Sequence, residues 1–219
     1  MPISRKKIVI VGPTAVGKTS IIARYIVPSF DISGHEVTIT PDFSQKTHTF
    51  GADQVKFSIV DTPGDPKHFS LASSVFHNCD FIIFVSSFDN ALSVESMAPD
   101  HPKSWTKHIL DSITDIDSIR CYYFINKEDL LTSYPPDLCV DKPQIARIFD
   151  EIKHRYPCFV QYHYVSALEN PKEIGKIFEG IAKSVTQTHP ESTPTEDTPI
   201  LPNPDQTSVS PCCKCCDIV

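Results

Sequence analysis

The sequence predicts an α/β fold built on a six-stranded, mostly parallel sheet with about five flanking helices. Apolar, strand-like runs alternate with segments of helical periodicity along residues 4–187. The first strand-like run ends in a glycine-rich segment, residues 12–19 with the sequence GPTAVGKT, which opens a helix-like run. One pair of strand-like runs is joined by only residues 51–54, too few for a parallel crossover, so one strand is expected to be antiparallel.

Each element is placed by its own pattern, in chain order. Strand-like runs predict strands at residues 7–11, 43–50, 55–61, 81–87, 119–125 and 159–165. Helical patterns predict helices at residues 18–27, 67–78, 91–112, 143–155 and 171–186. Within residues 91–116, Trp105, Ile109, Ile113 and Ile116 recur at helical spacing and are expected in the core. Residues 130–142, which contain two adjacent prolines, are expected to form an enlarged surface loop.

The 219 residues suffice for one folded domain and a tail. The domain is expected at residues 4–187, and residues 188–219 are expected to be a disordered tether, because residues 188–211 are rich in Pro, Thr, Ser and acidic residues and lack periodicity. The net charge of −7 argues against nucleic acid as a partner. No apolar run is long enough to cross a membrane, and we expect no secretory signal.

Residues 12–19 carry the pattern of a phosphate-binding loop, the P-loop. In such a loop, backbone N–H groups and a helix amino terminus surround phosphate oxygens, a lysine adds a positive charge, and the next hydroxyl holds Mg²⁺. Lys18 and Thr19 match the last two roles. The chain is therefore predicted to be a P-loop NTPase.

The ends of later strands indicate which nucleotide is bound. Asp61 ends one strand-like run, and Asn126 and Asp129 follow another. Because the carboxyl ends of neighbouring strands meet at the ligand crevice, Asp61 is expected beside Mg²⁺, and Asn126 and Asp129 beside the base. A carboxylate accepts two parallel hydrogen bonds from guanine, whereas adenine lacks that donor pair. The base is therefore predicted to be guanine, with the backbone at Ser166 and Ala167 reading its O6.

These residues resemble the small GTPases of the Ras superfamily, and Rab proteins most closely. The resemblance covers residues 5–187, and the motifs occur in the same order along the chain as in that family. After the P-loop, Thr38-Ile39 before Asp42-Phe43 is similar to the Rab switch I, and the sequence SSVF at 73–76 is similar to Rab switch II. The set of motifs is completed by Asp61-x-x-Gly64, Asn126-Lys127-x-Asp129 and Ser166-Ala167. The resemblance implies a G domain that binds GTP or GDP with Mg²⁺.

The combined motifs give a full set of candidate site residues. The expected nucleotide contacts are Gly12, Thr14, Ala15, Val16, Gly17, Lys18, Thr19, Ser20, Phe30, Thr38, Asp61, Gly64, Asn126, Lys127, Asp129, Ser166, Ala167 and Leu168. The expected metal ligands are Thr19, Thr38 and Asp61, and the expected catalytic residues are Lys18, Thr38, Gly64 and Asp65. Thr38 is chosen over Thr40 as the switch hydroxyl because of the Ile39 and Asp42-Phe43 that follow it.

The hydrolytic position departs from the family pattern. Asp65 stands where small GTPases carry the glutamine that orients the attacking water. An aspartate is one methylene shorter, and its charge near the γ-phosphate raises the energy of an anionic transition state. The sequence therefore predicts slow intrinsic GTP hydrolysis. Activating proteins of the Rab class bring their own glutamine and arginine, so Asp65 does not make the chain inert.

The chain ends in a cysteine cluster with the sequence CCKCCDIV. Cys216 lies fourth from the end, the position that is prenylated in C-a-a-X sequences, and Cys215 resembles the paired cysteines of Rab proteins. We expect lipid at both, because one lipid holds a protein only marginally. Farnesyl and geranylgeranyl both stay open, because Val219 matches neither terminal preference. Zinc binding or disulfide formation is the alternative, disfavoured by the close spacing and a cytosolic compartment.

The resemblance implies a Rab-like switch in vesicle or membrane trafficking. Its expected partners are an exchange factor, a GTPase-activating protein, a GDP-dissociation inhibitor or prenyl escort, effectors, and the cytoplasmic face of a membrane. Two alternatives stay open: a GTP-bound membrane scaffold with negligible hydrolysis, and a P-loop kinase for a small molecule. Nucleotide content after purification separates the first two, because a scaffold retains GTP.

Overall fold

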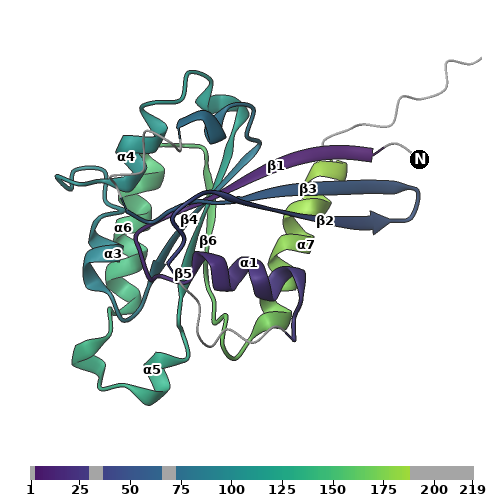
Figure 1. Cartoon of the computed structure of the whole chain (residues 1–219). Helices are drawn as coiled ribbons and strands as arrows, with labels where there is room; N and C mark the ends of the chain where they lie inside the picture. Colours follow the sequence, from purple (N-terminus) through teal and green to yellow (C-terminus); the bar gives the residue numbers. More distant parts are fainter. Residues whose placement is uncertain (1–2, 30–36, 66–72, 188–219) are drawn as a thin grey trace, which may run out of the picture. The chain divides into compact units, whose positions relative to one another are not determined.

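A computed structural model describes residues 3–29, 37–65 and 73–187 of the chain, which form a sheet between two layers of helices (Figure 1). The sheet has six strands in the order β2-β3-β1-β4-β5-β6. The strands are β1 (Ile3–Val11), β2 (Asp42–Phe50), β3 (Asp53–Asp61), β4 (Phe81–Ser87), β5 (Arg120–Asn126) and β6 (Phe159–Tyr164). All neighbouring strands run parallel except β2 and β3, so the predicted α/β class and its one antiparallel strand are confirmed.

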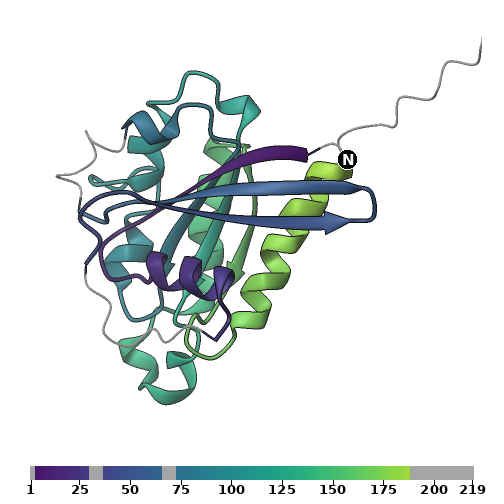
Figure 2. The same ribbon diagram turned by 45° about the vertical axis from the view of Figure 1, so that its right-hand side comes forward.

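The antiparallel pair β2–β3 is a long hairpin that extends beyond the rest of the sheet (Figure 2). Phe50 pairs with Asp53, so the turn contains only Gly51 and Ala52. Gly51 has a φ of 60°, which a glycine adopts at no steric cost. The turn is therefore two residues shorter than the four-residue connection that the sequence predicted.

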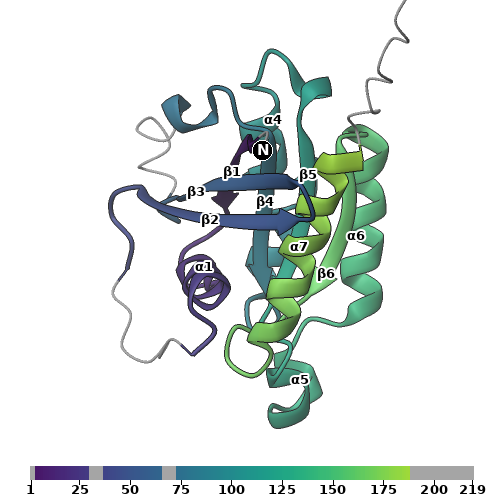
Figure 3. The ribbon, with the colours of Figure 1, turned by 90° about the vertical axis from the view of Figure 1, so that its right-hand side faces the viewer.

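Six α-helices are described, and five of them cover the two faces of the sheet. The six are α1 (Lys18–Ile26), α3 (Ala91–Glu95), α4 (Trp105–Leu110), α5 (Leu130–Ser133), α6 (Lys142–Arg155) and α7 (Pro171–Gln187). Helices α1 and α7 lie side by side on one face (Figure 3). Helices α3, α4 and α6 cover the other face, whereas α5 lies apart from both (Figure 1). None of the helices described is both long and apolar enough to span a bilayer.

Alternating residues of the central strands build two separate cores. In β1, Ile8 and Ile10 face α1 and α7 and pack in a cluster that includes Phe178. Val9 and Val11 point to the opposite face and join a cluster that includes Trp105 and Phe149. Strand β4 is buried along its whole length because both of its faces are covered. This rigid sheet carries the loops at its carboxyl edge.

The prediction of one helix over residues 91–112 is wrong. The chain forms α3 and α4 instead, separated by a turn-rich segment that contains Pro99 and Pro102. Proline lacks the N–H that a helix interior requires and disfavours helical backbone in the residue before it. The Ser104 side chain then starts α4 by accepting a hydrogen bond from the Lys107 N–H at 3.1 Å. Trp105 and Ile109 are buried as expected, and Ile113 and Ile116 pack against the core from beyond the helix.

Two further expectations concern loops. The segment predicted as a surface loop at 130–142 contains α5 and a 3₁₀ turn, Pro136–Leu138. Of the helix predicted at 67–78, only the end lies within the described residues, where it is a 3₁₀ helix, Ser73–Phe76. Phe30, Cys215 and Cys216 lie outside the described residues, as does the predicted tether.

Candidate functional site

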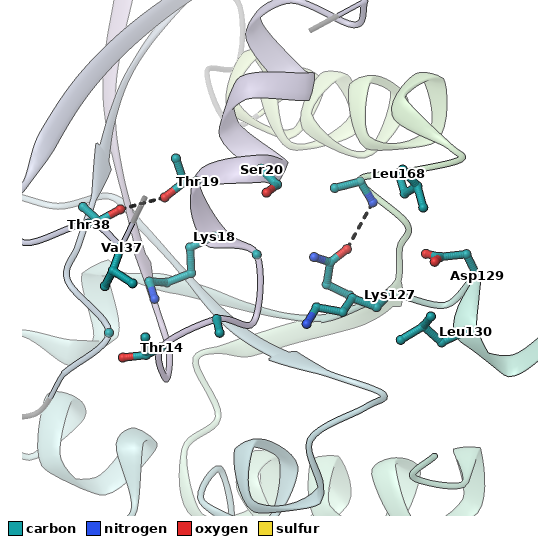
Figure 4. Close-up of a pocket in the computed structure, with 15 residues that line it drawn as sticks. Thr14, Lys18, Thr19, Ser20, Val37, Thr38, Lys127, Asp129, Leu130 and Leu168 are labelled. Atoms are coloured by element: carbon teal, nitrogen blue, oxygen red, sulfur yellow. Dashed lines mark hydrogen bonds between the residues drawn. The ribbon is translucent and has the colours of Figure 1, made fainter. Parts of the chain in front are cut away.

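A cavity of about 390 Å³ opens at the carboxyl edge of the sheet, where the loops after β1, β3, β5 and β6 converge (Figure 4). A volume of this size suits a small-molecule ligand. The cavity is lined by Thr14, Ala15, Gly17, Lys18, Thr19, Ser20, Val37, Thr38, Gly64, Asn126, Lys127, Asp129, Leu130, Ala167 and Leu168. Thirteen positions predicted from the sequence are thus brought together in one cavity, and the lining adds Val37 and Leu130.

One end of the cavity is the glycine-rich loop between β1 and α1. Gly12 has a φ of 145°, and a Cβ there would lie 2.1 Å from the Val85 carbonyl oxygen. Gly17 has a φ of 90°, and its added Cβ would lie 2.2 Å from the Asn126 side chain. Ala15 holds a φ of 65°, a left-handed conformation that glycine occupies more readily. The loop therefore curls tightly around the amino terminus of α1, where backbone N–H groups lack partners within the helix.

Lys18 lies inside this loop with only 6% of its surface exposed. Its ammonium group donates to the Gly12 and Pro13 carbonyl oxygens, both at 2.9 Å. Burial lowers the pKa of Lys18 to about 8, and the nearby Asp61 carboxylate opposes this shift. A buried cation beside a helix amino terminus forms an anion-binding site, and the loop geometry suits a phosphate chain.

A corner of hydroxyl and carboxylate oxygens borders this loop. The Thr19 hydroxyl donates to Asp61 Oδ2 at 2.5 Å and lies 2.9 Å from the Thr38 hydroxyl (Figure 4). The Asp61 Oδ1 atom is buried and has no hydrogen-bond partner in the described structure. Burial raises the pKa of Asp61, against the opposing effects of the Thr19 hydrogen bond and of Lys18. An orphaned carboxylate oxygen next to two hydroxyls is the oxygen-rich donor set that Mg²⁺ prefers.

The other end of the cavity holds Asp129 in a fixed orientation. The Ser166 hydroxyl donates to Asp129 Oδ1 at 2.5 Å and accepts from the Glu169 N–H at 2.9 Å. Asn126 connects this end to the glycine-rich loop, because its amide donates to the Val16 carbonyl at 2.9 Å and accepts from the Ala167 N–H at 3.1 Å. The Ala167 N–H, predicted to read guanine O6, is thus hydrogen bonded to Asn126 in this structure.

Lys127 crosses the cavity wall and ends in an ion pair that the sequence did not reveal. Its ammonium group lies 2.8 Å from Asp89 Oδ2, in the loop after β4. Ser87 donates to the other carboxylate oxygen of Asp89 at 2.6 Å. Although burial opposes it, these hydrogen bonds hold the pKa of Asp89 below its ordinary value. The two partners lie 38 positions apart, so local sequence pattern carries no signal for the contact.

Several predicted site residues lie outside the cavity lining. The Val16 side chain is buried in the core. Gly12 contacts Lys18 through its carbonyl oxygen, which accepts a hydrogen bond from the lysine ammonium group. Asp65 lines a neighbouring groove beside Pro13 and Phe76 instead of the cavity. Gly64 does reach the cavity and contacts the glycine-rich loop so closely that an added Cβ would lie 2.5 Å from the Thr14 nitrogen.

A mostly parallel sheet with a phosphate loop after its first strand and an Asn-Lys-x-Asp motif after its fifth defines a P-loop nucleotide-binding domain of the small-GTPase class. The comparison with family models agrees: the Ras family model matches residues 7–187, so the chain belongs to the Ras family. Its relatives make it a Rab-like small GTPase.

Rab and Ypt proteins from several organisms are among the similar proteins. The chain is 24% identical to the Ras-related protein Rab-21 of Geodia cydonium, over 86% of this chain and 74% of the relative. It is 25% identical to the Ras-related protein RABG3a of Arabidopsis thaliana, over 84% of this chain and 93% of the relative. It is 27% identical to the Ypt/Rab-type GTPase YPT7 of Saccharomyces cerevisiae, over 85% of this chain and 84% of the relative.

Proposed function

We propose that the chain is a guanine-nucleotide switch that binds GTP and GDP with Mg²⁺, hydrolyses GTP slowly, and acts in membrane trafficking. The observation that carries the proposal is a single cavity with a buried lysine at one end and a braced carboxylate at the other. Lys18 suits the phosphates, and Asp129 suits the guanine donor pair. Membership of the Ras family and similarity to Rab proteins support the same assignment.

The switch would depend on the corner formed by Thr19, Thr38 and Asp61. Asp61 and the two hydroxyls would hold Mg²⁺, which when bound neutralises charge on the phosphates. Thr19 follows the P-loop lysine and would serve in both nucleotide states. Thr38 belongs to a different segment and would be held only when a γ-phosphate is present. Loss of that phosphate would release the segment around Thr38 and change the surface offered to an effector.

Slow hydrolysis follows from the residue type and the position of Asp65. A carboxylate is an acceptor only, and its negative charge opposes the charge that develops on the transferred phosphoryl group. In addition, Asp65 faces the neighbouring groove, so it does not line the cavity in which water would attack. We expect intrinsic hydrolysis at or below about 10⁻⁴ s⁻¹, the scale of unassisted Ras-type proteins.

Single-turnover hydrolysis of bound GTP tests this prediction. The wild-type chain should be slow, Asp65→Ala should be no slower, and Asp65→Gln should be faster because glutamine can orient the water. Asp111→Ala is a matched control, since Asp111 lines the same groove far along the chain from the P-loop. A wild-type rate tenfold above the expected scale that survives Asp65→Ala would contradict the role assigned to Asp65.

The alternative function is a GTP-bound membrane scaffold with negligible hydrolysis, and the position of Asp65 is the observation that favours it. Following the bound nucleotide over time, with and without a Rab-class activating protein, separates the two. A cycling switch loses its γ-phosphate when the activating protein supplies the missing glutamine and arginine. A scaffold keeps GTP under both conditions.

The remaining parts of the proposal come from the sequence and the family. We propose a G domain at residues 4–187 and a tether at residues 188–219 that carries lipid at Cys215 and Cys216. The chain would then work at the cytoplasmic face of a vesicle or organelle membrane. Its proposed partners are the regulators typical of Rab proteins: an exchange factor, an activating protein, a GDP-dissociation inhibitor or prenyl escort, and effectors.

A further inference from the structure

Two cysteines on neighbouring strands hold their thiols together at the amino ends of β5 and β6. Cys121 is the second residue of β5, and Cys158 immediately precedes β6. Their Sγ atoms lie 3.5 Å apart and share a hydrogen bond. The Cys121 N–H also donates to the Cys158 carbonyl oxygen at 2.8 Å, so the backbone fixes the two residues as neighbours. The nucleotide cavity lies at the opposite ends of these strands. Six residues of strand separate the two sites, which is a distance of about 20 Å.

The two thiols differ in their access to solvent. Cys121 is fully buried in the core between the sheet and α6. Cys158 packs against the same core but remains partly exposed. The exposed member ionises first, and the hydrogen bond with Cys121 holds the pKa of the Cys158 thiol below its ordinary value. Burial raises the pKa of Cys121. An accessible thiolate beside a second thiol is the arrangement found in reversible oxidation sites.

We propose that Cys158 is a site of oxidation by peroxides and that Cys121 is its resolving partner, so that the pair closes to an intramolecular disulfide. In the first step the Cys158 thiolate attacks a peroxide oxygen. An S–O bond forms, the O–O bond breaks, and hydroxide leaves, which gives a sulfenic acid. In the second step the Cys121 sulfur attacks the Cys158 sulfur, the S–O bond breaks, and the Cys121 proton leaves with the hydroxide as water. Overall, two thiols and hydrogen peroxide give one disulfide and two water molecules.

The geometry allows this closure with little movement. The sulfur atoms must approach by about 1.5 Å to reach the length of a disulfide bond. Rotation of two short side chains accomplishes this, because adjacent strands already hold the backbones together. Cys79 is the third thiol near this region and is also buried, so it is less accessible to peroxide than Cys158.

The full-length chain allows a direct test by peptide mapping. Trypsin separates all the described cysteines: residues 121–127 carry only Cys121, residues 156–172 only Cys158, residues 128–147 only Cys139, and residues 68–103 only Cys79. After treatment with hydrogen peroxide and alkylation of free thiols, we expect a disulfide-linked species of peptides 121–127 and 156–172 that dithiothreitol separates. Bound nucleotide should be unchanged, since the pair lies far from the cavity.

Three variants assign the two roles. Cys121→Ser should stop at the sulfenic acid, which a cyclic diketone reagent traps on peptide 156–172, and Cys121→Ala gives the same test if the serine variant fails to fold. Cys158→Ser should lose both the trapped acid and the link. Cys139→Ser is the matched control, because Cys139 is also partly exposed but its Sγ lies 3.9 Å from the Leu130 carbonyl oxygen and pairs with no thiol among the described residues. It should form the link at the wild-type rate.

Three outcomes would overturn the proposal. The first is that peptides 121–127 and 156–172 stay unlinked while peroxide oxidises Cys139. The second is a disulfide between Cys79 and Cys121, which would show that Cys158 is not the partner of Cys121. The third is that the diketone reagent labels no sulfenic acid at Cys158 in a Cys121→Ser protein that still retains its nucleotide.

Discussion

At the scale of single residues, Lys18 determines how the affinity for nucleotide depends on pH. Its pKa is lowered to about 8 by burial, so the free protein loses the ammonium charge as pH rises through that value. Phosphate favours the charged form, so the bound protein must recover the proton. Affinity for GDP should fall about fourfold between pH 7 and pH 8.5, the ratio expected when one group of this pKa must be protonated for binding.

Titration calorimetry at the two pH values measures this effect. In two buffers with different ionisation enthalpies, binding at pH 8.5 should take up about three quarters of a proton, the fraction of Lys18 that a pKa of about 8 leaves deprotonated there. Lys18→Met removes the titrating group, so its weaker affinity should be flat over the same range. A wild-type affinity that does not change with pH would contradict the ionisation assigned to Lys18.

Gly12 is the residue for which the structure leaves no room for a side chain. A Cβ there would lie 2.1 Å from the Val85 carbonyl oxygen, and the φ of 145° disfavours any L residue. Gly12→Ala should therefore displace the loop that holds Lys18 and abolish nucleotide retention through purification. Gly180→Ala is the control, because its Cβ meets nothing within 4 Å on α7 and should stabilise the chain by about 0.5–1 kcal/mol. Retention of nucleotide by Gly12→Ala would show that the loop can move aside.

At the scale of secondary-structure elements, Ser104 starts α4 after a segment with two prolines. Its buried hydroxyl accepts from the Lys107 N–H at 3.1 Å and lies 3.1 Å from the Thr106 hydroxyl. Ser104→Ala should lower the free energy of unfolding by about 1 kcal/mol, the typical value of an N-cap. Urea denaturation measures the change. Ser118→Ala on the surface should change the free energy of unfolding by less than about 0.5 kcal/mol. If the two variants lower it equally, Ser104 does not stabilise α4 as an N-cap.

Elements that depend on local pattern could be predicted from the sequence, and elements that depend on distant partners could not. The strands and the P-loop follow from runs of apolar residues and from glycine spacing, so α1 begins where predicted and β1 ends where predicted, although β1 begins at Ile3, four residues earlier than predicted. Pro99 and Pro102 are signals that a helix ends before them. The helical spacing of Trp105 and Ile109 nevertheless favours one continuous helix, which is why the sequence pattern predicts residues 91–112 as a single helix. Contacts between Lys127 and Asp89, or between Asp129 and Ser166, join segments that only the folded sheet brings together.

At the scale of the whole molecule, both hydrophobic clusters and the described part of the cavity lining fall within positions 3–187. The two clusters that cover the faces of the sheet draw on α1, α6 and α7, with α7 ending at Gln187. Burial of apolar surface supplies most of the stability of such a domain. Stability and nucleotide binding should therefore depend on these residues, whereas attachment to a membrane should depend on the lipid proposed for the tail.

Truncation after residue 187 separates these two properties. The shortened chain should retain its guanine nucleotide and unfold at the same temperature as the full chain, within about 2 °C, because a 1 kcal/mol change would shift the midpoint by about 2–4 °C. The prenylated full chain should float with phospholipid vesicles in a density gradient, and the truncated chain should stay in the aqueous fraction. The Cys215→Ser, Cys216→Ser double variant matches the full chain in length and charge, so its failure to float would assign membrane binding to lipid alone. If that variant floats as well as the wild type, another part of the chain binds the membrane, and if the truncated chain loses its nucleotide, the domain boundary proposed at residue 187 is wrong.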